Sequence, residues 1–132
     1  MNLYQVDIFR TRTYKDIYNE PCDCIYCKNF RVAFSSYTPK AYDFLKTIGL
    51  SPENALEVME TPYEKGMYHY RIFFSLGGTL NKDGICVYEE NAKIIFYISN
   101  SPKLLYNNTR MKEPCFIAEV LVDLPWAMEE KK

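Results

Sequence analysis

Three of the five cysteines in this chain lie within six residues, at Cys22, Cys24 and Cys27. Thiolate sulfur is a preferred ligand of Zn²⁺, and the Cys24-x-x-Cys27 spacing is common in small tetrahedral zinc sites. Cys22 could supply a third thiolate. The remaining candidate ligands stand alone in predicted strands: Cys86, Cys115 and His69. The cluster therefore predicts a zinc site whose fourth ligand comes from elsewhere in the fold or from a second subunit.

The same segment has a second interpretation, in which the thiols carry no chemistry. If Asp23 is the N-cap of the helix that follows, its carboxylate accepts backbone N–H groups and favours the positive end of the helix dipole. Cys22 and Cys27 then occupy the N′ and N4 positions, which pack together as a hydrophobic staple. The cysteines would be small apolar groups at the helix entrance. We favour this interpretation over zinc because the sequence offers no second pair of ligands.

A third interpretation is thiol–disulfide chemistry, since a helix N-terminus lowers the pKa of a thiol. Thioredoxin-like proteins place such a pair straight after a parallel strand. Here Cys24 and Cys27 follow a predicted helix and Pro21, and the carboxylate of Asp23 would oppose a thiolate. A thiol oxidoreductase is therefore the least favoured of the three.

Other catalytic arrangements have little support in the sequence. His69 is the single histidine, so a Cys–His nucleophile would need it beside one particular cysteine. No serine elbow or glycine-rich phosphate loop is present. Acidic residues are expected on solvated strand ends and turns: Glu57, Glu60, Glu89 and Glu90. We therefore expect a protein that is not an enzyme.

The chain is rich in aromatic residues, with 12 Tyr, 8 Phe and 1 Trp. Tyrosines could line a groove or a partner surface: Tyr63, Tyr68, Tyr70 and Tyr88. Aromatic residues also favour strands and pack well across a half-buried sheet. We favour a place in the core, because the strand alternation already explains most of them.

The elements that position the cluster follow from the periodicity of apolar residues. Residues 3–10 alternate and predict an N-terminal strand, and a short helix is expected from Thr13. Three- and four-residue steps predict a helix directly after the cluster, with Asn29 and Arg31 off its apolar face. Its buried stripe is Cys27, Phe30, Phe34 and Tyr37. Thr38-Pro39 starts the next helix, which Gly49 ends in the left-handed conformation.

From residue 59 onward the period changes to two, which indicates strands. A tip at 64–66 joins 56–60 to 68–76, and further strands are expected at 85–89, 93–99 and 115–124, the last with Glu119 and Asp123 facing solvent. Residues 100–113 predict a long surface loop. We expect one α+β domain over residues 1–132, with the N-terminal strand and helices packed on one face of a mainly antiparallel sheet of about five to six strands.

Composition narrows the partners and the compartment. Lys and Arg total 16 and Asp and Glu 17, for a net charge of −1. This balance argues against nucleic acid or an anionic membrane as the main partner. Residues 1–7 do not read as a signal peptide, and no apolar stretch reaches membrane-spanning length. We expect a cytoplasmic protein without disulfides, with no cofactor unless it binds zinc, and with an unidentified protein as its partner.

On these residues the chain resembles an uncharacterised family of small bacterial proteins. The family pattern combines a C-D-C-x-x-C-x-N-[FY] segment after a Tyr-bearing helix, an L-x-x-x-G-[LIV] helix end, and a strand that runs into Leu-Pro-Trp. Here these are Cys22 to Phe30, Leu45 to Leu50, and Leu124-Pro125-Trp126. The resemblance covers most of the chain and implies no activity. The expected function is a non-enzymatic bacterial accessory or protein-interaction domain, with a structural zinc-binding domain and a thiol oxidoreductase as alternatives.

Overall fold

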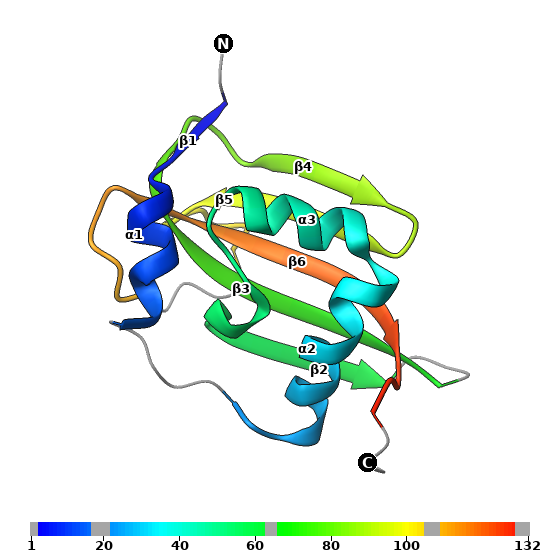
Figure 1. Ribbon diagram of the computed structural model, residues 1–132. Coiled ribbons are helices and arrows are strands. Elements are labelled where there is room, and N and C mark those ends of the chain that lie inside the picture. The colour runs from blue at the N-terminus through cyan, green and yellow to red at the C-terminus, as the bar shows by residue number, and fades with distance from the viewer. Residues whose placement is uncertain (1–2, 17–21, 63–65, 105–108, 129–132) are drawn as a thin grey trace.

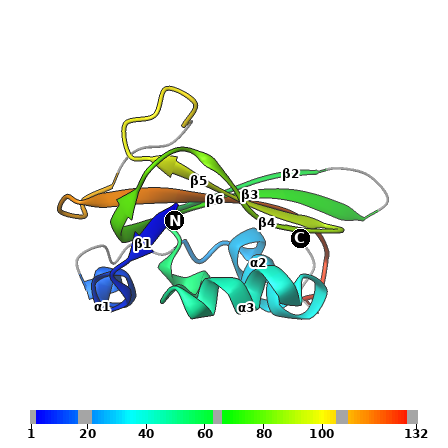
Figure 2. The same ribbon diagram turned by 90° about the horizontal axis from the view of Figure 1, so that it is seen from above.

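The computed structural model describes residues 3–16, 22–62, 66–104 and 109–128. As the sequence predicts, it has an α+β arrangement in which the helices lie against one face of a sheet (Figure 1, Figure 2). The elements are β1 (Tyr4–Val6), α1 (Ile8–Arg12), the 3₁₀ helix η1 (Thr13–Asp16), α2 (Ile25–Tyr37), α3 (Pro39–Thr47), the 3₁₀ helix η2 (Pro52–Asn54), β2 (Glu57–Pro62), β3 (Met67–Leu80), β4 (Gly84–Glu89), β5 (Ala92–Ile98) and β6 (Cys115–Pro125).

The sheet has six strands, and all its described pairings are antiparallel. The long strand β3 lies between β6 on one side and both β2 and β1 on the other, and β5 and β4 follow β6. At Gly78 the backbone has φ +132°, and a Cβ there would lie 2.0 Å from the Gln5 carbonyl oxygen. Only glycine permits β1 to approach so closely. The sheet curls at this end, and the ring of Tyr4 packs edge-on against Phe96 with centroids 4.9 Å apart.

The main core lies between the sheet and the two longer helices. The predicted stripe of α2 is buried except for Tyr37, which is 50% exposed, and α3 buries Ala41 and Leu45. Gly49 ends α3 with φ +87°, and the Leu50 N–H donates to the Leu45 carbonyl at 2.9 Å, as expected for a Schellman cap. Tyr68 and Tyr70 are buried in this core, as favoured from the sequence, while the Tyr63 and Tyr88 side chains lie outside the described part.

The prediction of one strand over residues 3–10 is wrong beyond Val6. The carboxylate of Asp7 accepts the Arg10 N–H at 3.1 Å and caps α1, so the chain turns into a helix where the alternation suggested a strand. The Thr11 hydroxyl, fully buried, accepts the N–H of Gly77 on β3 at 3.0 Å. This contact fixes α1 at the edge of the sheet.

The prediction that Glu119 faces solvent is also wrong, because Glu119 is only 3% exposed. The Arg71 Nε donates to its carboxylate at 3.0 Å, and the Tyr97 hydroxyl donates to the other oxygen at 3.0 Å. A second apolar cluster, which includes Phe73 and Met111, covers part of this outer face. Figure 2 shows the segment after β5 rising over the face of the sheet opposite the helices.

Candidate metal centre

The three cysteines of the cluster come together in space. Their sulfur atoms all lie within 4.8 Å of one another. Cys22 and Cys24 are exposed, whereas Cys27 is buried. Sulfur ligands about 2.3 Å from a tetrahedral zinc ion stand about 3.8 Å apart, so a small inward movement brings all three to ligand positions. The cysteines predicted as metal ligands are therefore close enough to hold one ion together.

The start of α2 positions two of these sulfurs. Cys24 is the N-cap residue, with extended backbone at φ −65° and ψ 162°, and Ile25 is the first helical residue. Cys27 is thus the third helical residue, and side chains three apart lie on the same side of a helix. The Cys24 carbonyl accepts the Lys28 N–H at 3.0 Å, which closes the first turn.

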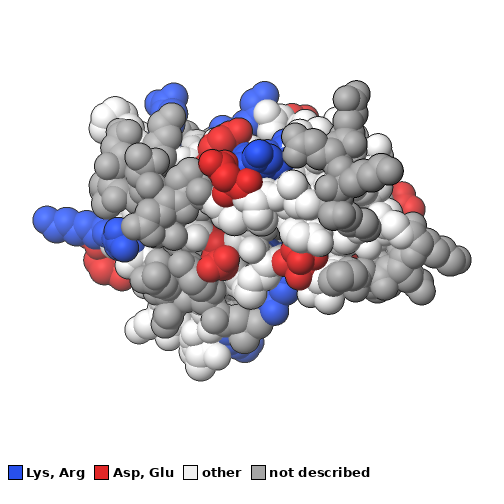
Figure 3. Space-filling view, turned by 90° about the horizontal axis from the view of Figure 1, so that it is seen from below, with Lys and Arg blue, Asp and Glu red and all other residues white. Residues whose placement is uncertain are grey.

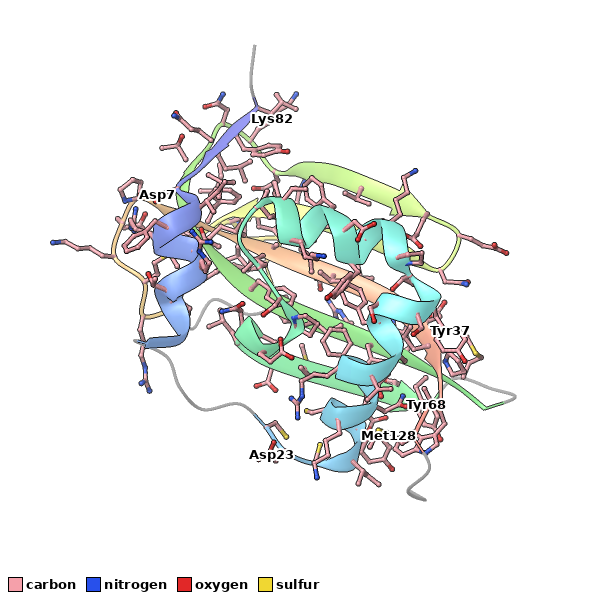
Figure 4. The ribbon with its side chains drawn as sticks, viewed as in Figure 1. Asp7, Asp23, Tyr37, Tyr68, Lys82 and Met128 are labelled. Carbon is pink, nitrogen blue, oxygen red and sulfur yellow. The ribbon has the colours of Figure 1, made fainter. Side chains whose placement is uncertain are left out.

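Arg31, one turn further along α2, holds the segment that carries Cys22. Its guanidinium donates to the Cys22 carbonyl oxygen at 3.1 Å and to the Asp23 carboxylate at 3.3 Å. Figure 4 shows Asp23 on the coil that leads into α2. The sequence signal for this role is an arginine four residues after Cys27, the spacing of one helical turn.

The capping interpretation of the cluster is wrong in both of its parts. Asp23 lies one position before the N-cap, and its side chain, 85% exposed, pairs with Arg31 instead of the helix N–H groups. With Cys24 as the N-cap, Cys22 and Cys27 fall at N″ and N3, outside the staple positions. Cys22 is moreover exposed, so it does not seal the helix entrance as an apolar group.

The environment of Cys24 favours its thiolate. Partial burial raises the pKa of the Cys24 thiol, but the N–H groups of Cys27 and Tyr26 and the side chains of Cys22 and Cys27 lower it more, so its pKa falls below the ordinary value. The side chain makes no regular capping hydrogen bond. The effect is therefore that of helix N-terminal dipoles directed toward a nearby sulfur. Metal binding requires the thiolate, so the lowered pKa makes Cys24 a readier ligand than a cysteine with the ordinary value.

The pKa of the Cys27 thiol is shifted in the opposite direction. Burial raises its pKa well above the ordinary value, and the nearby Cys22 and Cys24 side chains raise it further through hydrogen bonds and charge. Without a cation, therefore, the thiol of Cys24 ionises more readily than that of the neighbouring buried Cys27. A divalent ion would lower the pKa of Cys27 by placing positive charge beside its sulfur.

Asn29 attaches the N-terminal part of α2 to the rest of the fold. It is fully buried, contrary to the expectation that it lies off the apolar face. Its amide donates to the Tyr70 hydroxyl at 3.2 Å and to the Pro125 carbonyl at 3.1 Å, and its Oδ1 accepts the Ala127 N–H at 2.6 Å. The Tyr70 hydroxyl donates to the Tyr26 carbonyl at 2.9 Å. The first turn of α2 is thus tied to β3 and to the chain after β6.

Aromatic rings add to the connection between α2, β3 and the chain after β6. The Trp126 ring lies edge-on to Tyr26, with centroids 5.8 Å apart, and 5.7 Å from Tyr68. Figure 4 shows Tyr68 near the C-terminal segment that contains Met128. The segments that carry the sequence resemblance, Cys22 to Phe30 and Leu124 to Trp126, therefore contact each other.

The other candidate ligands lie apart from the cluster. Among the described residues, the group of mutually close ligand atoms contains only the three cysteines. His69 instead pairs with Asp123, with Nδ1 and Oδ1 2.7 Å apart. Cys115 is buried in the second apolar cluster, where burial and Glu113 raise its pKa to about 11. The Cys86 side chain lies outside the described part of the structure.

One face of the molecule carries both acidic and basic side chains among its described residues (Figure 3). Figure 3 shows acidic and basic side chains interspersed with uncharged ones over the coloured part of one face. None of the described helices combines the length and the apolar character required to cross a membrane.

Comparisons of the chain with protein-family models, with curated proteins and with solved structures find no match.

Proposed function

We propose that this chain is a zinc-binding domain in which Cys22, Cys24 and Cys27 hold one structural zinc ion. The observation that supports it is the mutual distance of the three sulfurs, all within 4.8 Å. Zn²⁺ combines readily with several thiolates and has no redox chemistry of its own. The ion would join the segment before α2 to the first turn of that helix, a connection that otherwise depends on the contacts of Arg31.

The electrostatics of the cluster support a cation at this position. Three sulfurs so close together cannot all ionise at neutral pH without a compensating charge, because each thiolate raises the pKa of its neighbours. This mutual repulsion is consistent with the lowered pKa of Cys24 beside the raised pKa of Cys27. A divalent ion removes it and displaces the remaining protons.

The test is the metal content of protein purified without a chelator. We expect about one zinc per chain by mass spectrometry of the metal, released with a chelator and bound again on dialysis. Cys24→Ser should lose the metal and lower the melting temperature measured in zinc. Cys115→Ala removes a buried thiol outside the cluster and should retain the metal. Wild-type protein that neither carries nor binds zinc would refute the proposal.

A second function, thiol oxidation and reduction, is favoured by one observation: the low-pKa thiol of Cys24 is exposed beside the exposed thiol of Cys22. The Cys24 thiolate would attack one sulfur of a substrate disulfide and release the other as a thiolate. Cys22 would then displace the bound half, which leaves the substrate reduced and a Cys22–Cys24 disulfide. Metal-free protein that fails to reduce a model disulfide would exclude this function.

A further inference from the structure

A glutamate on the strand beneath α2 has one oxygen atom without a hydrogen-bond partner among the described residues. Glu60 lies on β2, and its Oε2 is buried and makes no hydrogen bond with any described residue. From the sequence, this residue was expected on a solvated strand end. A buried carboxylate oxygen without a donor is costly, so its position calls for an explanation in the neighbouring structure.

Strand register places this carboxylate on the helix-covered face of the sheet. Glu60 pairs with Tyr70 across the β2–β3 ladder. Directly opposed residues of an antiparallel pair project to the same face, with side chains in contact range. Tyr70 is fully buried on the face that packs against α2, where its ring lies 5.8 Å from that of Phe30. Glu60 therefore points toward α2 from below.

The obvious protein donor is already used. The single hydroxyl proton of Tyr70 goes to the Tyr26 carbonyl at 2.9 Å, and the hydroxyl oxygen accepts from Asn29 at 3.2 Å. Tyr70 thus has no proton left to offer Glu60. Tyr26 lies between Cys24 and Cys27 in the first turn of α2. The hydrogen bond from the Tyr70 hydroxyl to its carbonyl therefore brings the sheet close to the buried side of the cysteine cluster.

We propose that Glu60 is the fourth ligand of the metal held by the three cysteines, an inference that rests on the proposed zinc function. Carboxylate oxygen is an accepted zinc ligand, and a fourth protein ligand closes a structural site. Glu60 lies outside the group of sulfurs within 4.8 Å of one another, so its side chain must turn toward the ion as the metal binds. The ion would provide the missing partner of Oε2.

The arrangement also fits the exposure of the ligands. Cys22 and Cys24 face solvent, and Cys27 is buried. A carboxylate that approaches from the sheet would complete the coordination on the inner side, where water has least access. Three thiolates and a carboxylate leave the zinc site negatively charged, and the guanidinium of Arg31, bonded to the Cys22 carbonyl, would offset part of that charge.

The experiment substitutes Co²⁺ for zinc in three proteins: wild type, Glu60→Gln and Glu57→Gln. Glu57 lies on the same strand but pairs with Phe73, on the opposite face, and is exposed, which makes it a matched control. Charge-transfer absorption reports the sulfur ligands, and visible d–d absorption reports the geometry and the fourth ligand. Competition with a coloured chelator gives the affinity for each metal.

For Glu60→Gln we expect unchanged sulfur charge transfer, altered d–d absorption, and metal affinity reduced by at least about tenfold. Glu57→Gln should match wild type in all three. If Glu60→Gln also matches wild type, the Glu60 inference is overturned while the zinc function stands. If wild type binds neither Co²⁺ nor Zn²⁺, the zinc function is refuted and the Glu60 inference with it.

A measurement on the unaltered protein covers the case in which Glu60→Gln does not fold. X-ray absorption of the wild-type zinc protein should show three sulfur ligands at about 2.3 Å and one oxygen ligand at about 2.0 Å. Four sulfur ligands would overturn the inference. The folding of each metal-free variant is checked by the fluorescence of Trp126.

Discussion

Replacement of Asn29 by alanine tests how far the stability of the protein depends on the connection of α2 to β3 and to the end of β6. The fully buried Asn29 amide makes three hydrogen bonds, to the Tyr70 hydroxyl, the Pro125 carbonyl and the Ala127 N–H. Each buried hydrogen bond contributes about 1 kcal/mol, so Asn29→Ala should lower the free energy of unfolding by about 3 kcal/mol. That is a large share of the roughly 5–15 kcal/mol typical of a domain and corresponds to a fall in melting temperature of about 10 °C.

The measurement is urea unfolding followed by tryptophan fluorescence and circular dichroism, with a chelator present so that bound metal does not contribute. Trp126, the single tryptophan, packs on the same helix turn and reports directly on this region. Ser36→Ala, at an exposed position of α2, is the matched control and should change stability by less than about 0.5 kcal/mol. If Asn29→Ala costs no more than the control, water replaces the lost contacts and the reasoning is refuted.

Four further outcomes follow from the structure. Gly78→Ala should reduce stability severely in thermal unfolding, since its Cβ would meet the chain of β1. Arg31→Met should weaken zinc binding in a chelator competition while the protein stays folded, because the segment that carries Cys22 loses its hydrogen bond to the Arg31 guanidinium. In metal-free protein, mass spectrometry should find Cys24 alkylated by iodoacetamide faster than Cys27. Burial and the adjacent Glu119 carboxylate raise the pKa of Tyr97 to about 12. The stability from its protonated hydroxyl is therefore complete below about pH 10 and lost as the pH rises toward 12; equal alkaline unfolding of Tyr97→Phe and wild type would contradict this.

Periodicity was enough to predict the fold class and most elements. The helix starts and stops carried explicit local signals, such as the proline after Thr38 and the left-handed Gly49. The side-chain cap of α3 was not predictable, because Thr38 donates to the Phe34 carbonyl and the distant Glu89 carboxylate accepts the Ala41 N–H instead. The predicted N-terminal strand is too long because residues 3–10 alternate in the sequence, although Asp7 within this range caps a helix.

The candidate site could be predicted only in its local part. The spacing of Cys22, Cys24 and Cys27 was sufficient to predict them as candidate metal ligands, and in the structure their sulfur atoms lie close together. The contacts of Asn29 and the position of Glu60 depend on strand register and on residues nearly a hundred positions away, which no local pattern encodes. The bacterial origin, the cytoplasmic location, and the absence of nucleic acid among its partners stay predictions, as does the protein partner.

The bonds from Asn29 to Pro125 and Ala127 have a consequence for the order of events during synthesis. The three cysteines are synthesised well before Pro125 and Ala127, yet the helix turn that carries them reaches its final contacts only when these two residues are available. Until then the thiols are held by local structure alone. A metal ion bound to the nascent chain would therefore precede the fold, and its ligands would gain their rigid support only once Pro125 and Ala127 have been synthesised.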